Sequence, residues 1–330
     1  MQGTWIGLAE GADLEAAQAA LQALGVWSRP LRGARGGAAA LQILPHSARV
    51  EAATLLAVPG VREVWTEPSP HPRVDAQAGR PALVSGLPIG PGAAPVLGAG
   101  PCAIESRARA EEAAALAAEA GARLVRGGAW KPRTSPYAFQ GHGLEALGWL
   151  REAADRRGLL VVSEVMAPED AALAAPLVDL IQVGSRSMQS FPLLRAIGAT
   201  GKPALLKRGA AAPVEDWLLA AEHLLLAGAG GVIFCERGVR GFDPETRNLL
   251  DLGAVALLAH AYGQPVLVDP SHAAGRRDLV APLAGAALAA GAHGLLVEAH
   301  PDPACARSDG AQALEPAALR ALAERLFPAR

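Results

Sequence analysis

Residues 96–131 read VLGAGPCAIESRARAEEAAALAAEAGARLVRGGAWK, and the pattern of this stretch indicates the fold class. A short apolar run (96–104) is followed by an Ala/Leu-rich segment of helical character (108–120) and then by a second short apolar run (123–129). Short apolar strands that alternate with helices are typical of parallel βα units, because a parallel sheet is buried on both faces.

The same alternation continues to the end of the sequence. Further strands are predicted at 159–165, 177–185, 204–208, 231–236, 266–269 and 294–298, with helices between them, for instance at 214–227 and 249–261, and a last helix at 317–327. Eight βα units match a closed barrel, whereas a doubly wound open sheet usually stops at about five or six strands. We therefore predict an α/β fold with a (β/α)8 TIM barrel over residues 96–330.

Residues 1–70 have a different pattern. A strand (4–8) precedes a helix for which Asp13 is the expected N-cap and in which Leu14, Ala17, Leu21 and Leu24 form one apolar stripe. Strands at 29–34 and 38–44, a helix at 49–57 and a strand at 62–65 complete the order βαββαβ. This order predicts a small ferredoxin-like α+β domain, a module often used to bind regulators. The Pro/Gly-rich residues 71–95 are predicted to be a linker with a hairpin.

The composition limits the class of partner. The 330 residues carry a formal net charge of −2, so no basic field favours nucleic acid or an anionic membrane surface. Three cysteines are too few for a disulfide framework, and the N-terminal stretch lacks the basic region of a signal peptide. No apolar run is long enough to cross a bilayer. We expect an unprocessed cytoplasmic protein with small-molecule partners.

Nearly every predicted barrel strand has an apolar body and a polar or charged end. In a parallel barrel these ends meet at one mouth, where barrel enzymes place their catalytic groups. A single charged strand end is common as a solvated loop anchor, but a full set predicts an active site. The residues are Cys102 and Glu105, Arg126 and Lys131, Glu164, Arg186, Lys207 and Arg208, Glu236 and Arg237, Asp269 and His272, and Glu298 and His300.

Five of these ends concentrate positive charge, which favours a ligand that carries phosphate and carboxylate groups. They are Arg126, Lys131, Arg186, Lys207 and Arg237. Internal pairing with Glu164, Glu236 and Asp269 is the alternative, and both arrangements can hold at once. Lys207 could also form a Schiff base, although the neighbouring Arg208 favours a phosphate contact.

A second group combines a thiol, an imidazole and two carboxylates. Cys102, His272, Glu298 and Asp309 come from adjacent strand ends and a following loop, so they can surround one ion. Such a mixed ligand set suits Mn, Fe, Co or Zn better than Mg or Ca. Taken singly, Cys102 could be a core residue and His272 could cap a turn.

Five motifs together closely resemble the 3-deoxy-D-arabino-heptulosonate 7-phosphate (DAHP) synthases, and the resemblance extends from residue 96 to the end. The motifs are GPCAIES (100–106), GGAWKPRTSPY (127–137), LKRG (206–209), CERG (235–238) and DPSH (269–272). The resemblance implies an enzyme, a transferase of the shikimate pathway of aromatic amino-acid biosynthesis, which condenses phosphoenolpyruvate with erythrose 4-phosphate and releases phosphate.

The resemblance also implies roles for individual residues. Cys102, His272, Glu298 and Asp309 would hold the metal. The phosphate and carboxylate of phosphoenolpyruvate would be bound by Arg126, Lys131, Arg186, Lys207 and Arg237, and the phosphate of erythrose 4-phosphate by Arg133, Thr134 and Ser135. Lys131 would protonate the nascent alkoxide, and Glu164 would position or activate the attacking water.

The N-terminal pattern resembles the regulatory domain of one branch of this family, which implies feedback inhibition by an amino acid such as tyrosine or phenylalanine. The family also implies a homo-oligomer, either a dimer or a tetramer. Two positions depart from the family pattern: Trp130 replaces the usual Phe, and His142 has no expected role.

Two other functions are considered. The related 3-deoxy-D-manno-octulosonate 8-phosphate synthases use arabinose 5-phosphate on a similar barrel, but they carry Asn where this chain has Pro132-Arg133. A catalytically silent metabolite sensor would need binding groups but not the full set of metal ligands together with Lys131.

Overall fold

The computed structural model describes residues 3–32, 38–131 and 135–328. The chain divides into two compact units, Met1–Pro70 and His71–Arg330. No helix in the described ranges combines the length and the apolar character needed to cross a membrane.

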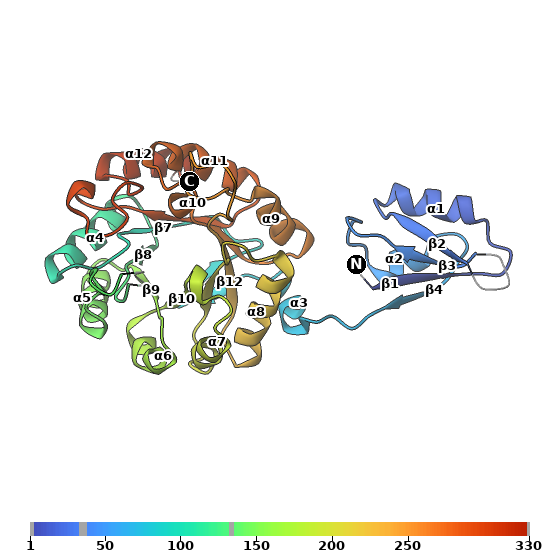
Figure 1. The fold of residues 1–330 in the computed structure, drawn as a ribbon, viewed down its shortest axis with the longest axis horizontal. Helices are drawn as coiled ribbons and strands as arrows, with labels where there is room; N and C mark the ends of the chain where they lie inside the picture. The colour runs from blue at the N-terminus through green and yellow to red at the C-terminus, as the bar shows by residue number, and fades with distance from the viewer. Residues whose placement is uncertain (1–2, 33–37, 132–134, 329–330) are drawn as a thin grey trace. The chain divides into compact units, whose positions relative to one another are not determined.

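Eight parallel strands close into a barrel in the second unit, in the order β10-β11-β12-β13-β14-β7-β8-β9, and helices surround it (Figure 1). The predicted TIM barrel is therefore confirmed. Strands that follow one another in the sequence are neighbours in the barrel, as expected for repeated right-handed βα units. The strands are β7 (Val96–Gly100), β8 (Leu124–Arg126), β9 (Leu160–Glu164), β10 (Leu180–Val183), β11 (Ala204–Lys207), β12 (Val232–Glu236), β13 (Val266–Val268) and β14 (Gly294–Glu298).

The helices of this unit mostly follow the predicted positions. The helix expected at 249–261 is divided into an α-helix and a π-helical turn, Leu257–Ala261. The helices are α4 (Arg107–Glu119), α5 (Leu144–Asp155), α6 (Pro168–Ala174), α7 (Phe191–Gly198), α8 (Val214–Leu226), α9 (Leu252–Ala256), α10 (Pro270–Ala274), α11 (Val280–Ala289) and α12 (Pro316–Leu326).

Several strands are shorter than predicted, and β7 shows why. It ends at Gly100, whose φ is +146°, and a Cβ atom there would lie 2.2 Å from the carbonyl oxygen of Arg126. Only glycine allows this close approach of two backbones. Residues 101–104, predicted as part of the strand, therefore lie in the loop that follows β7 at the barrel mouth.

The barrel core has two layers. Inward-facing residues such as Leu124, Leu205 and Ile233 fill the interior, and a larger layer packs the outer face of the strands against the surrounding helices. Both layers consist of residues that are almost fully buried, as expected for a sheet covered on both faces. The packed interior leaves the strand ends as the place where polar groups can face solvent.

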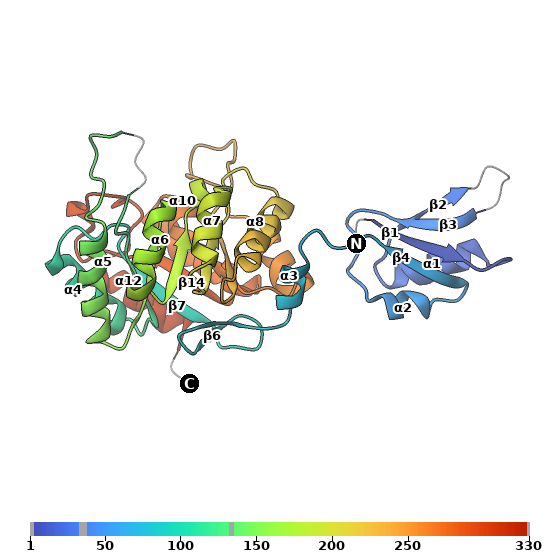
Figure 2. The ribbon, with the colours of Figure 1, turned by 90° about the horizontal axis from the view of Figure 1, so that it is seen from below.

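Residues 71–95, predicted as a linker with a hairpin, belong to the barrel unit. The hairpin pairs β5 (Ala82–Val84) with β6 (Leu87–Ile89), and its inward side chains join the interior layer of the barrel. Figure 2 shows β6 at the end of the barrel opposite the long loops. The helix α3 (Pro72–Gln77) packs on α8, where Glu222 accepts hydrogen bonds from the backbone N–H groups of Arg73 and Val74. The segment thus closes the barrel floor.

The first unit contains β1 (Thr4–Leu8), α1 (Leu14–Ala23), β2 (Ser28–Arg32), β3 (Ala38–Ile43), α2 (Ala52–Leu56) and β4 (Val61–Thr66). Its sheet is antiparallel in the order β2-β3-β1-β4, and its own core includes Ile6, Leu21, Leu41 and Leu55. The side chain of Asp13 accepts a hydrogen bond from the N–H of Ala16 and so caps α1, because an N-cap carboxylate satisfies an unpaired donor.

Candidate active site and metal centre

A cavity of about 650 Å³ opens at the carboxyl ends of the barrel strands. Among the described residues, seven basic and two acidic side chains line it, so the cavity has a strong excess of positive charge. Most residues predicted for the site meet here, namely Cys102, Arg126, Lys131, Ser135, Glu164, Arg186, Lys207, Arg237, His272 and Asp309. Glu298 lies behind the wall and is 1% exposed. Arg133 and Thr134 fall outside the described residues.

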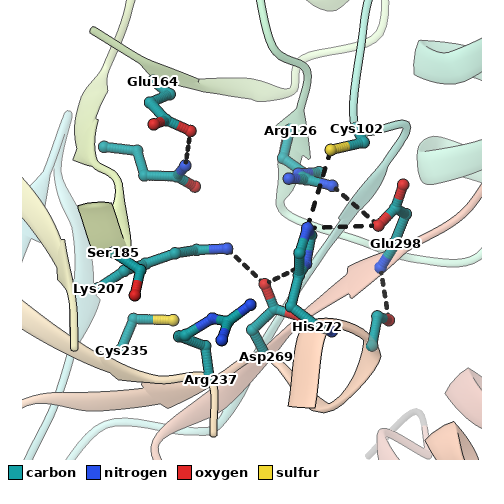
Figure 3. A network of polar contacts seen from close by, with 12 residues as sticks. Cys102, Arg126, Glu164, Ser185, Lys207, Cys235, Arg237, Asp269, His272 and Glu298 are labelled. Carbon is teal, nitrogen blue, oxygen red and sulfur yellow. Dashed lines mark hydrogen bonds and ion pairs between the residues drawn. The ribbon is translucent and has the colours of Figure 1, made fainter. Parts of the chain in front are cut away.

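The four predicted metal ligands form one cluster, and Figure 3 shows three of them side by side. One ligand atom each from Cys102, His272, Glu298 and Asp309 lies within 4.8 Å of the others. Nε2 of His272 is 3.8 Å from Sγ of Cys102 and 3.6 Å from Oε2 of Glu298. The buried Oε1 of Glu298 has no hydrogen-bond partner among the described residues. An unsatisfied carboxylate oxygen beside a thiol and an imidazole fits a divalent transition metal.

Burial changes the protonation of this cluster. It raises the pKa of the Cys102 thiol to about 11, and burial together with the nearby Asp309 raises the pKa of Glu298 to about 7. Burial also lowers the pKa of His272 to about 3, so the imidazole is neutral and able to bind a metal. Burial would raise the pKa of Asp309, but a hydrogen bond from Cys102 and the interactions with His272 and the Lys131 ammonium hold it below the ordinary value. A divalent cation would stabilise the ionised thiol and carboxylates.

Asp269 orients the histidine ligand. Its Oδ1 accepts a hydrogen bond from the backbone N–H of His272 at 2.9 Å, and its Oδ2 lies 2.8 Å from Nδ1 of the same ring. The other ring nitrogen therefore faces the cluster, as in carboxylate-histidine-metal arrangements. Burial would raise the pKa of Asp269, but its contacts with His272 and Lys207 hold it well below the ordinary value.

The cationic side chains divide into two groups. Lys207 pairs with Asp269 and also lines the cavity, whereas Arg208 pairs with Glu236 and Asp251 behind the cavity wall, so internal pairing accounts for Arg208. Arg126 is 6% exposed, and its Nη1 lies 3.8 Å from Oε2 of Glu298, an ion pair too long to be a hydrogen bond, so this buried donor has no hydrogen-bond partner in the described part of the chain. A buried donor of this kind at a cavity wall fits an anionic ligand.

Glu236 positions another cation. Its Oε1 accepts hydrogen bonds from the backbone N–H groups of Arg237 at 3.1 Å and Gly238 at 2.6 Å. These bonds fix the turn that carries Arg237, which is 7% exposed and lines the cavity. Burial disfavours the charged guanidinium and lowers the pKa of Arg237. An anionic ligand would offset this cost of removing the charge from water.

The two candidate catalytic groups lie at different places in the cavity wall. Nζ of Lys131 is 2.6 Å from Sγ of Cys102, which places the ammonium next to the metal cluster. Glu164 lies apart from that cluster in Figure 3 and accepts a hydrogen bond from Nε2 of Gln182 at 3.0 Å. A Cβ atom on Gly184 would lie 2.0 Å from Oε1 of Glu164, so only glycine leaves room for this carboxylate.

Sequence reasoning missed some residues of the site. Gln182 had a usable signal, because it is a polar residue inside the apolar strand β10. Arg240, Arg247 and Asn248 line the cavity from the loop after β12, where no strand pattern points to them. Gln312 was also missed, although its side chain donates a hydrogen bond to Oε2 of Glu298 at 2.7 Å.

The structure gives His142 a packing role. Its ring lies 5.2 Å from the ring of Phe139 and 5.5 Å from that of Trp149, and its Nε2 is 3.2 Å from the backbone oxygen of Glu105. The guanidinium of Arg307 packs on the Phe139 ring, 4.5 Å from its centroid. His142 therefore joins the loops after β7 and β8, and the cluster also touches the loop after β14.

Comparisons with known proteins agree with the predicted resemblance. The sequence model of the DAHP synthetase I family matches residues 74–327. A protein from Thermotoga maritima named phospho-2-dehydro-3-deoxyheptonate aldolase is 48% identical over 188 residues, 57% of this chain and 56% of the relative. A Rhodopseudomonas palustris protein named 2-dehydro-3-deoxyphosphooctonate aldolase is 35% identical over 181 residues, 53% of this chain and 62% of the relative. The match thus spans little more than half the length of these relatives.

A solved structure resembles the chain over nearly its whole length. The crystal structure of the Thermotoga maritima phospho-2-dehydro-3-deoxyheptonate aldolase (DAHP synthase) is 36% identical and gives a TM-score of 0.75. The likeness covers 98% of this chain and 95% of that one. Together with the family match over residues 74–327, it shows that the chain belongs to the DAHP synthetase I family.

Proposed function

We propose that the protein is a transferase that condenses phosphoenolpyruvate with D-erythrose 4-phosphate to give 3-deoxy-D-arabino-heptulosonate 7-phosphate and inorganic phosphate. The observation that carries the proposal is the adjacency of two features in one cavity. A four-residue cluster suited to a divalent metal lies beside a wall of basic side chains suited to anionic substrates. The names of the Thermotoga maritima relatives support the same reaction.

The basic side chains would hold phosphoenolpyruvate. Arg126, Arg186, Lys207 and Arg237 would bind its phosphate and carboxylate, and the buried Nη1 of Arg126, which makes no hydrogen bond in the described part of the chain, supports this assignment. A bound metal, held by Cys102, His272, Glu298 and Asp309, would supply Lewis-acid polarisation of the sugar aldehyde. Ser135 lines the same cavity, and we propose that it binds the phosphate of erythrose 4-phosphate together with Arg133 and Thr134.

Proton transfers are assigned to the two remaining groups. When C3 of phosphoenolpyruvate forms the new bond to the aldehyde carbon, the aldehyde oxygen becomes an alkoxide, and Lys131 would protonate it. The contact between Lys131 Nζ and the metal ligand Cys102 supports this placement of the proton donor. Glu164 would orient the water that adds to C2, after which the C2–O bond breaks and phosphate leaves. The hydrogen bond from Gln182 supports a fixed carboxylate in this role.

The N-terminal unit is proposed to bind a feedback inhibitor such as tyrosine or phenylalanine. Its antiparallel sheet with two helices and its own core supports a separate binding module. The proposal includes a homo-oligomer, either a dimer or a tetramer, and a reducing cytoplasm, which three free cysteines favour.

The test measures phosphoenolpyruvate loss and phosphate release by chelator-treated protein before and after addition of Mn²⁺. Turnover restored by the metal with erythrose 4-phosphate is the expected result. Preference for arabinose 5-phosphate would instead select the octulosonate reaction, which the name of the Rhodopseudomonas palustris relative favours. Binding of phosphoenolpyruvate without turnover of either sugar would favour a sensor and contradict the proposal.

A further inference from the structure

The two carboxylates of the metal cluster are joined by a chain of hydrogen bonds outside the cluster itself. Nε2 of Gln312 donates to Oε2 of Glu298 at 2.7 Å, and Oε1 of Gln312 accepts from Nη1 of Arg247 at 3.2 Å. The same Nη1 donates to Oδ1 of Asp309 at 3.0 Å. A continuous path therefore runs from one carboxylate through an amide and a guanidinium to the other.

The chemistry of the path fixes the orientation of the amide. Glu298 can only accept a hydrogen bond when ionised and Arg247 can only donate, so the amide nitrogen of Gln312 must face the carboxylate and its oxygen the guanidinium. In the reverse orientation the amide oxygen would face the Glu298 carboxylate, acceptor against acceptor, and the amide nitrogen would face the Arg247 guanidinium, donor against donor. Gln312 is 2% exposed, so its hydrogen bond to Glu298 is shielded from water, whereas the contact between Arg247 and Asp309 is exposed. The arrangement is a specific one rather than a surface encounter.

Backbone contacts hold both members of the path in place. The N–H of Arg247 donates at 3.0 Å to the oxygen of Ala274, the last residue of the helix α10 that carries His272. The N–H of Gln312 donates to the oxygen of Asp309 at 3.2 Å, within the turn that carries this ligand. Each member of the path is thus attached to a backbone segment that also presents a metal ligand.

We propose that Gln312 and Arg247 are positioning residues that act as one relay and hold the carboxylates of Glu298 and Asp309 ready for a divalent metal. The inference rests on the proposed function, since it assumes that the cluster binds a metal. Two carboxylates brought close together repel each other, and each also has several rotamers to lose. The relay supplies a donor to each carboxylate and reduces both costs before the metal arrives. Partners of this kind typically contribute about 10- to 100-fold to metal affinity.

The experiment titrates the full-length, metal-free chain with Mn²⁺ and measures free Mn²⁺ by electron paramagnetic resonance. The variants are Gln312→Met, Arg247→Met and the double variant. Each single change is expected to weaken Mn²⁺ binding about 10- to 100-fold. The double variant should bind Mn²⁺ with about the affinity of whichever single variant binds it less tightly, because either change breaks the same path. Arg247→Lys, which keeps a charged donor, should recover part of the affinity.

Arg276→Met is the matched control, because Arg276 pairs with Asp278 at 2.8 Å on the same unit and touches no ligand of the cluster. It should leave Mn²⁺ affinity unchanged. If Gln312→Met does not fold, Arg247→Met and Arg247→Lys still test the relay, since the Arg247 side chain is 40% exposed. Unchanged affinity in these variants, or fully additive losses in the double variant, would overturn the relay. A wild-type chain that binds no Mn²⁺ would instead refute the metal site of the proposed function, and the inference with it.

Discussion

Two residues of the metal cluster, Cys102 and Glu298, must lose protons before they can bind a cation. Their pKa values are raised to about 11 and about 7, whereas His272, with a pKa of about 3, is already neutral. Below pH 7 two protons should leave with each bound metal, and between pH 7 and 11 only the thiol proton. We therefore expect Mn²⁺ affinity to rise about 100-fold per pH unit in the lower range and about tenfold per unit in the upper range.

Titrations with Mn²⁺ at a series of pH values measure this dependence. Cys102→Ser should weaken binding and remove the slope in the upper range, because a hydroxyl does not ionise there. Cys235→Ser is the matched control, since Cys235 is also buried with a pKa raised to about 12 but is not part of the cluster. An affinity that does not change with pH would refute the assignment of the two proton-releasing ligands.

Gly184 has no side chain and so leaves the space that the Glu164 carboxylate occupies. A Cβ atom at this position would lie 2.0 Å from Oε1 of Glu164, so Gly184→Ala must displace the carboxylate. A displacement of about 1 Å at a catalytic group can cost about 100-fold in rate, and we expect kcat to fall by about that factor while Mn²⁺ affinity is unchanged. Steady-state kinetics together with the Mn²⁺ titration separate the two effects.

Gly148→Ala is the control for this change. Gly148 lies in α5, and a Cβ atom there would meet nothing within 4 Å. Alanine should therefore leave kcat unchanged and stabilise the helix by about 0.5–1 kcal/mol. Equal kinetics for Gly184→Ala and Gly148→Ala would show that Glu164 does not need its observed position.

At the scale of elements, the β5–β6 hairpin is expected to stabilise the barrel without taking part in the chemistry. Ile89 is 0% exposed and packs into the interior layer, while Leu83 on the same hairpin is 58% exposed. Ile89→Ala should lower the free energy of unfolding by about 2–5 kcal/mol, whereas Leu83→Ala should change it little. Denaturant unfolding of the barrel unit measures both. Equal losses in the two variants would contradict the role of the hairpin as a barrel floor.

The barrel elements were predictable because their signal is local. Most strands show an apolar body followed by a polar residue at or just after the end, so Glu164, Lys207 and Glu298 could be placed at one end of the barrel from the sequence alone. The hairpin itself was predicted, but its packing against the barrel could not be assigned in this way. Its alternation of buried and exposed residues is only three residues long on each strand, and its packing partners are spread over the whole barrel. Proline and glycine around it therefore suggested a linker.

The same limit applies to the partners of the predicted ligands. Gln312 and Arg247 lie in loops, and their roles arise from contacts with residues 14 and 62 positions away in the sequence, respectively. Nothing in the local pattern distinguishes them from solvated loop residues. His142 is a similar case, because its packing on Phe139 and Trp149 depends on how the loop after β8 closes. The sequence thus predicts which groups meet at the barrel mouth better than which groups hold them there.

At the scale of the whole molecule, the division into two units separates the site from the N-terminal module. All the residues that line the cavity and all four members of the metal cluster lie within His71–Arg330, among the residues that the structure describes. The N-terminal sheet has its own core and supplies none of these groups. The proposed catalysis and the proposed inhibitor binding therefore fall in different parts of the chain and can be tested separately.

We expect a chain of residues 71–330 to fold and to keep metal-dependent condensation, but to lose inhibition by tyrosine or phenylalanine. A chain of residues 96–330 should fail to fold stably, because it lacks α3 and the hairpin. Its interior layer would lose Ala82, Val84 and Ile89, and Val232 would lose the hydrogen bond that its N–H donates to Gln77 at 2.8 Å. Circular dichroism, thermal unfolding and turnover compare the two chains. If residues 96–330 fold and turn over as well as 71–330, the segment 71–95 is a linker after all. If residues 71–330 keep full inhibition, the inhibitor site belongs to the barrel.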